Sequence, residues 1–231
     1  MKNHFKKSRL AVALTALTLL STVGTAQATV FEIDFKTSGA FSGTAPGSPG
    51  LNTVFATAIF DDHGGSGSVT LTMNVLSNLS SGAYVNDWYF NVSSAPLSGI
   101  SFVSGVAATA NPTPVENGSN AFKADGTGGY FDFAFHFKPS NPGELGQGHT
   151  SVYTLTGAGI TANSFNSVSV PGPGGGYLSA LHVQGYGNSV WIAGTQGDPG
   201  GGGGAQIPEP ATLALIGLGL FGVAATRRRR A

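Results

Sequence analysis

The amino-acid sequence predicts an all-β domain, an antiparallel β-sandwich of jelly-roll type, between an N-terminal signal helix and a single C-terminal transmembrane helix. Apolar and polar residues alternate with period two in several short stretches, as they do in strands with one buried face. Turn-forming residues separate these stretches, and the chain holds 36 glycines and 12 prolines. No stretch between the two ends shows a convincing helical period, so the pattern favours a sandwich.

The predicted strands are short and evenly distributed along the body of the chain. They cover residues 31–36, 54–60, 69–75, 83–92, 100–106, 131–137, 151–156, 165–170, 177–183 and 189–193. The clearest is YFDFAFHF, in which four phenylalanines between Phe131 and Phe137 share one face, while Asp132 and His136 fall on the other. Four aromatic rings along one strand indicate a substantial core, so we expect a folded domain over residues 29–193.

The first 28 residues have the three parts of a secretory signal peptide. Four basic residues open the chain: Lys2, Lys6, Lys7 and Arg9. An apolar stretch follows at residues 10–20, and Ala26-Gln27-Ala28 supplies the small-residue pattern that signal peptidase cleaves. The alternative is an N-terminal membrane anchor, but the apolar stretch is short for a span of about 20 residues.

The last 25 residues predict a membrane segment with a processing point. Residues 211–226 carry no charge, and as a helix they would span about 24 Å, close to the ~30 Å hydrocarbon core of a bilayer. A cluster of four arginines ends this segment and would stop translocation on the cytoplasmic side: Arg227, Arg228, Arg229 and Arg230. Pro208 and Pro210 would hold the chain extended just outside the membrane, where a processing enzyme can bind it.

The order of Pro208-Glu209-Pro210, an apolar run and an arginine cluster resembles the PEP-CTERM sorting signal of Gram-negative bacteria. The resemblance implies export across the inner membrane, transient anchoring, and removal of residues 207–231 by a membrane-embedded exosortase. It also implies a cell-surface or extracellular destination in a setting of exopolysaccharide and biofilm matrix, which makes exopolysaccharide a candidate partner. The alternative is a C-terminal anchor that is never cleaved.

The body also resembles a recurrent group of PEP-CTERM proteins through DWYFNV at 87–92, FKADGTGGYFDFAF at 122–135 and LHVQGYGNSVWIA at 181–193. That group has no established activity, so the resemblance implies no catalytic residues. Between the body and the tail, residues 194–206 read GTQGDPGGGGGAQ and predict a flexible glycine-rich tether.

The composition argues against several classes of function. From Thr29 to Gln206 the chain has three lysines and ten acidic residues, a net charge of −7, which argues against nucleic-acid binding. There is no cysteine, so disulfides, thiolate metal sites and thiol nucleophiles are excluded. The motifs G-x-S-x-G and H-E-x-x-H are also absent.

Two binding sites remain as candidates. Asp61 and Asp62 in DDHGGSG, with Asp125 in KADGTGG, are candidate calcium ligands, although aspartate in a turn more often serves the turn itself. A sugar site would pair an aromatic platform with polar groups, and its candidate residues are Asp87, Trp88, Tyr89 and Trp191. Trp88 and Tyr89 would point to opposite faces of a strand, so one of them would face outward.

These observations predict an exported cell-surface or extracellular-matrix protein with a structural or adhesive role and no enzymatic activity. One alternative is a carbohydrate-binding module, with or without calcium as a cofactor. The other is a secreted glycan-active hydrolase, which would need two carboxylates facing each other across a cleft.

Overall fold

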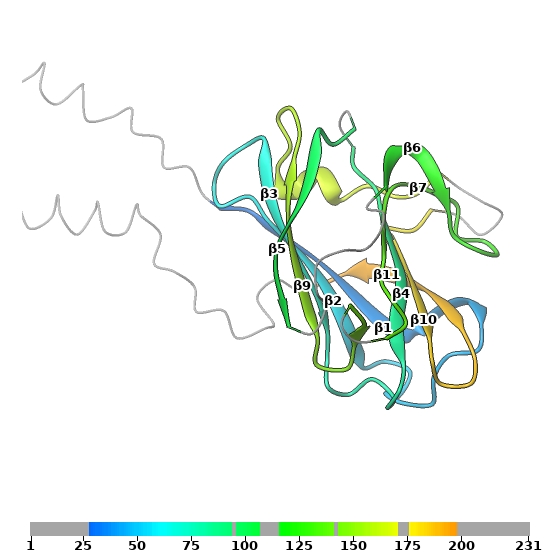
Figure 1. The fold of residues 1–231 in the computed structure, drawn as a ribbon. Helices are drawn as coiled ribbons and strands as arrows, with labels where there is room; N and C mark the ends of the chain where they lie inside the picture. Colours follow the sequence, from blue (N-terminus) through cyan, green and yellow to red (C-terminus); the bar gives the residue numbers. More distant parts are fainter. Residues whose placement is uncertain (1–27, 94–95, 107–115, 141–142, 171–175, 198–231) are drawn as a thin grey trace, which may run out of the picture. The chain divides into compact units, whose positions relative to one another are not determined.

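The computed structural model describes residues 28–93, 96–106, 116–140, 143–170 and 176–197, and these form an all-β domain (Figure 1). The described strands are β1 (Val30–Gly43), β2 (Val54–Asp61), β3 (Ser68–Val75), β4 (Tyr84–Phe90), β5 (Gly99–Val106), β6 (Glu116–Lys123), β7 (Tyr130–His136), β8 (Leu145–Gly146), β9 (Thr150–Thr156), β10 (Ser179–Gln184) and β11 (Val190–Gln196). A single turn of 3-10 helix, η2 (Ala162–Phe165), precedes β10.

The strands form one continuous antiparallel sheet. Their order is β5-β9-β3-β2-β1-β11-β10-β4-β7-β6, and β8 pairs with β4 beside this path. The prediction of an all-β, antiparallel fold is therefore confirmed. The two separate sheets of a sandwich are replaced by a single sheet that curls, with the long strand β1 pairing with β2 on one side and β11 on the other.

The curl brings the inner faces of the two halves of the sheet together. Phe60 of β2 packs edge-on against Phe90 of β4, with ring centroids 5.5 Å apart. Phe135 of β7 lies 4.6 Å from Tyr153 of β9. These strands are not neighbours in the sheet, so the contacts are made across the interior, and this interior is the main hydrophobic core.

The four phenylalanines between Phe131 and Phe137, in β7 and just after it, do not all enter this core. Phe133, Phe135 and Phe137 belong to it, as predicted. Phe131 is also buried, but it joins a second, smaller cluster with Tyr89, at a centroid distance of 6.0 Å. The irregular pairing of β6 with β7 between Asn117 and Phe122 places Phe122 opposite Phe131 in this cluster.

One predicted strand is wrong, and the other nine are confirmed in position. The segment from Phe165 to Val170 is the end of η2 followed by irregular chain, with a lone bridge between Val170 and Tyr130. Thr161 and Ser164 form a capping box there, and such polar side chains favour turns because they bond to nearby backbone groups. The alternation of apolar and polar residues in FNSVSV, at 165–170, was therefore not enough to predict a strand.

Two described strands were not predicted, and one boundary moves. The sequence ENGSNAFK of β6 is mostly exposed and lacks a period-two pattern, and β8 has only two residues. Strand β11 continues to Gln196, three residues into the range predicted for the tether, because its backbone still pairs with Ile33 and Asp34 of β1.

Several predictions fall on residues outside the described part of the chain. These residues are 1–27, which include the cleavage residue Ala26, and 198–231. The second range holds the sorting residues Pro208, Glu209 and Pro210 and the predicted transmembrane helix with its four arginines. Within the described residues, no helix has the length and apolar character needed to cross a membrane.

The aromatic core gives a direct test of the curl. Phe90 contacts Phe60, Phe133 and Phe135 and is 1% exposed, so we expect Phe90→Ala to lower the free energy of unfolding by about 3–5 kcal/mol. Urea unfolding followed by tryptophan fluorescence measures it. The control is Val103→Ala at an exposed site, with an expected change within about 0.5 kcal/mol; equal effects of the two would contradict the packing described.

Candidate functional site

Four neighbouring strands place a row of polar and aromatic side chains across the sheet. The register sets His136 of β7 opposite Asp87 of β4, Asp87 opposite His182 of β10, and His182 opposite Trp191 of β11. None of these four residues belongs to the main core. We call this set, together with Tyr89, the outer row.

Asp87 is the centre of the outer row. One carboxylate oxygen accepts a hydrogen bond from Nδ1 of His136 at 2.5 Å, and the other accepts from Nδ1 of His182 at 2.9 Å and from the side-chain amide of Asn86 at 2.8 Å. The side chain of Asp87 is only 13% exposed. One carboxylate therefore ties three adjacent strands together through their side chains.

This arrangement shifts the proton affinities of its members. Burial alone would raise the pKa of Asp87, but the hydrogen bonds from His136, His182 and Asn86 outweigh it and hold the pKa far below its usual value. The hydrogen bond to Asp87 raises the pKa of His136 above the ordinary value, against the opposing effect of burial. The pair of Asp87 and His136 thus favours the ionic form, which is typical of a close carboxylate–imidazole contact.

The aromatic members of the outer row are packed against their neighbours. The ring of Trp191 stacks on His182 with centroids 4.5 Å apart and an interplanar angle of 3°. The ring centroids of Tyr89 and Trp191 are 5.0 Å apart, and the two rings are tilted by 50° to each other. Tyr89 and Trp191 are 9% and 8% exposed, so little ring surface is open to a sugar. Burial raises the pKa of the Tyr89 hydroxyl, with added repulsion from Asp87 and Glu116.

The structure brings three of the four candidate sugar-binding residues together. Asp87, Tyr89 and Trp191 are in the outer row, whereas Trp88 is fully buried in the main core. There its indole N–H donates to the hydroxyl of Ser179 at 3.2 Å. Sequence reasoning missed His136 and His182, because histidines 46 positions apart give no local motif and only the register aligns them.

The carboxylates of the three candidate calcium ligands accept hydrogen bonds from backbone N–H groups. Asp62 is 5% exposed, and its carboxylate accepts backbone N–H groups from Thr29, Gly64 and Ala162 at 2.8, 3.0 and 3.2 Å. Burial would raise its pKa, yet these hydrogen bonds and the nearby His63 lower it overall. Asp62 therefore joins the end of β2 to the start of the domain and to η2.

Asp61 and Asp125 each accept one backbone N–H group. The carboxylate of Asp61 accepts the backbone N–H of His63 at 2.7 Å. Asp125 is exposed in the turn between β6 and β7, where it accepts the N–H of Gly126 at 2.8 Å. In the described part of the chain, no group of three or more His, Cys, Asp or Glu side chains is arranged to hold a metal ion.

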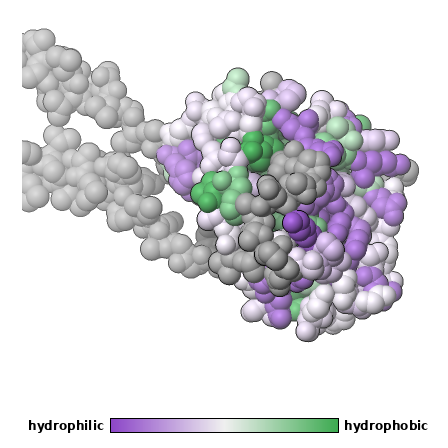
Figure 2. All heavy atoms as spheres, viewed as in Figure 1, coloured by the Kyte–Doolittle hydropathy of each residue, from purple (hydrophilic) through white to green (hydrophobic). Residues whose placement is uncertain are grey.

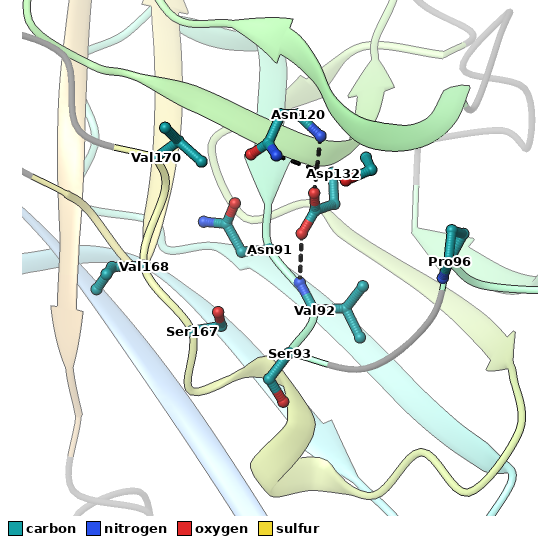
Figure 3. Close-up of a pocket in the computed structure, with 10 residues that line it drawn as sticks. Asn91, Val92, Ser93, Pro96, Asn120, Asp132, Ser167, Val168 and Val170 are labelled. Carbon is teal, nitrogen blue, oxygen red and sulfur yellow. Dashed lines mark hydrogen bonds between the residues drawn. The ribbon is translucent and has the colours of Figure 1, made fainter.

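A pocket of about 280 Å³ opens where β4 leaves the sheet, near β6, β7 and the segment after η2 (Figure 3). Asp132 of β7 lines it. One carboxylate oxygen accepts the N–H of Val92 at 3.0 Å, and the other accepts the N–H of Asn120 at 2.9 Å. The remaining lining is a mixture of small polar and apolar residues: Asn91, Ser93, Pro96, Ser119, Ser167, Val168 and Val170. The sequence reading assigned no binding role to these residues.

Comparison with known proteins adds information on the tail. Residues 206–230 match the family model of the PEP-CTERM protein-sorting motif. No curated protein and no solved structure matches the chain. The motif implies export and membrane-associated processing, with a cell-surface or extracellular destination, and such motifs are recognised by exosortase-type systems. The resemblance predicted for residues 207–231 is therefore confirmed, and that of the body stays a prediction.

The outer row predicts a bell-shaped dependence of stability on pH. The contribution of Asp87 is present above the ordinary aspartate pKa of about 4 and is lost as the pH falls through its lowered value. The contribution of His136 is present below the ordinary histidine pKa of about 6.5 and is lost as the pH rises through its raised value. We expect His136→Gln to abolish the fall on the alkaline side of that window, as measured by urea unfolding across pH.

The matched control is His63→Gln. His63 also pairs with an aspartate, Asp61, but its side chain is 68% exposed, so its ion pair contributes little. A fall in stability above neutral pH that His136→Gln leaves unchanged would contradict the role given to the outer row.

Asp62 and Asp61 offer a second matched pair. Asp62→Asn removes an acceptor for buried backbone N–H groups and should cost about 1–3 kcal/mol of stability, whether or not calcium is present. Asp61→Asn, at a half-exposed site in the adjacent position, should cost less. Thermal unfolding with calcium and with a chelator measures both; stabilisation of the wild-type chain by calcium that Asp62→Asn abolishes would instead support a calcium site.

Proposed function

We propose that this chain, with the PEP-CTERM motif at its C-terminal end, is an exported cell-surface or extracellular-matrix protein with a structural or adhesive role. The observation that carries the proposal is the match of residues 206–230 to the sorting motif, after a folded β domain in the chain. Residues 198–205 between them read DPGGGGGA, a composition typical of a flexible linker. In this proposal the tail delivers the domain, and the domain acts outside the cell.

The order of the remaining segments supports this assignment. Residues 1–28 have the composition of a signal peptide, which would begin the export that the tail completes. The four arginines at 227–230 would keep the end of the chain cytoplasmic. The two ends therefore agree on an orientation in which the β domain leaves the cytoplasm, and a signal peptidase and an exosortase-like enzyme are the processing partners.

The described residues of the domain support a binding or structural role more than a catalytic one. Its core is built from packed aromatic rings, and the carboxylate at the centre of the outer row is occupied by two histidines. The pocket has one carboxylate, Asp132, in its described lining, whereas a glycosidase needs two across a cleft. On the face in Figure 2, hydrophobic residues form small separate groups among hydrophilic ones.

The sorting proposal is tested by intact mass. The chain is expressed in a bacterium that has an exosortase and recovered from membranes and medium. We expect a released species that starts near Thr29 and ends near Pro208–Pro210. Substitution of Pro208, Glu209 and Pro210 by alanine should retain the chain in the membrane fraction with residues 211–231 attached, because the motif that is recognised is gone.

The control substitution is Asp198→Ala in the linker, which leaves the motif intact and should be released like the wild-type chain. If the wild-type chain keeps its tail in cells with an active exosortase, the protein is a plain membrane-anchored domain and the proposal of sorting is wrong.

A further inference from the structure

The pocket beside Asp132 has features of a ligand site that the sorting role leaves unexplained. Its walls come from four separate parts of the fold: residues that follow β4, strand β6, strand β7 and the segment from Ser167 to Val170. Its volume of about 280 Å³ lies just below the range for small-molecule sites, roughly 300–1,000 Å³. The space therefore suits one ring-sized ligand rather than an extended chain.

Asp132 presents a fixed negative charge to this space. Its two oxygens each accept one backbone N–H, from Val92 and Asn120, which holds the carboxylate in one orientation (Figure 3). Each oxygen keeps further acceptor capacity. Among the described residues, no Lys, Arg or His forms an ion pair with Asp132. The carboxylate is thus a positioned acceptor that can take hydrogen bonds from a ligand.

Asn91 provides a second acceptor in the same pocket. The residue is 2% exposed, and its amide nitrogen donates to the carbonyl of Tyr177 at 3.3 Å. This hydrogen bond fixes the amide and sets its orientation. Asn91 is one of the residues that line the pocket. An amide oxygen can accept two hydrogen bonds, so that of Asn91 is available to a ligand hydroxyl.

The rest of the lining is hydroxyl and hydrocarbon. Ser93 and Ser167 contribute hydroxyls, which both donate and accept. Val168 and Val170 are 56% and 46% exposed, and they offer a hydrocarbon surface beside the acceptors. A ligand that fits this lining carries adjacent hydroxyl donors on one side and C–H groups on another, and it has no negative charge.

We propose that this pocket binds a single neutral sugar residue, with two neighbouring hydroxyls donating to Asp132 and Asn91 and the C–H face of the ring against Val168 and Val170. The site differs from the outer row, whose rings are covered by their neighbours. The inference rests on the proposed adhesive role outside the cell, to which it adds a class of partner: a neutral glycan presented at a chain end or side branch.

The test uses the full chain purified from membranes in detergent. The probes are the methyl glycosides of glucose, galactose, mannose and N-acetylglucosamine, and binding is measured by saturation-transfer-difference NMR in the presence of a chelator. We expect at least one glycoside to bind. Ser167→Phe should abolish this binding by filling the pocket, and Asp132→Asn should weaken it about tenfold or more, since a charged acceptor is lost.

The control is Ser101→Phe, the same substitution at an exposed position of β5, which should bind like the wild-type chain. Thermal unfolding of each variant shows whether it is folded. If Asp132→Asn is unstable, the binding of Ser167→Phe decides the result. Absence of binding by all four glycosides, or equal binding by Ser167→Phe and the wild-type chain, would overturn the proposal. The mass measurement of processing is independent, so failure here leaves the sorting role standing.

Discussion

The packing of aromatic rings across the interior is the interaction on which the rest of this domain depends. The sheet is one continuous ladder, and hydrogen bonds between neighbouring strands do not by themselves decide how far it curls. The curl is set by ring contacts across the interior, such as the edge contact of Phe60 with Phe90, whose centroids are 5.5 Å apart, and that of Phe35 with Trp88, at 5.1 Å. Each of these contacts joins two strands that are not neighbours in the sheet, and burial of apolar surface such as these rings is the dominant favourable term in folding.

Both surface sites are consequences of this packing. With Trp88 and Phe90 fixed inward, the residues between and beside them on β4 are turned away from the main core, which places Asp87 and Tyr89 in the outer row. The same strand ends at Phe90, and the chain beyond it turns past β7, where the N–H of Val92 reaches Asp132. The positions of the outer row and of the pocket therefore both depend on β4, because the core fixes the side chains on the inner face of this strand.

The sequence allowed the fold class, most strands and the sorting tail to be predicted, because each has a local signature. Alternation identifies a strand such as β7, and the order of Pro208-Glu209-Pro210, apolar run and arginines identifies the tail. The curl could not be predicted, since it depends on which rings meet across the interior. Asp87 was a candidate, but its partners His136 and His182 depend on strand register. The role of Asp62 depends on distant backbone groups at Thr29 and Ala162.

The position of the last strand has a mechanical meaning. Strand β11 is not at an edge: it is paired with β1 on one side and β10 on the other, and it ends at Gln196, beside Ile33 near the start of the domain. A pull directed along β11 loads its hydrogen bonds with β1 from Gln196 to Val190, and those with β10 from Ala193 to Val190, in shear rather than one by one. If the domain is held by its C-terminal end, the force therefore acts on an interior strand. Removing β11 from the sheet would break its pairing with both β1 and β10.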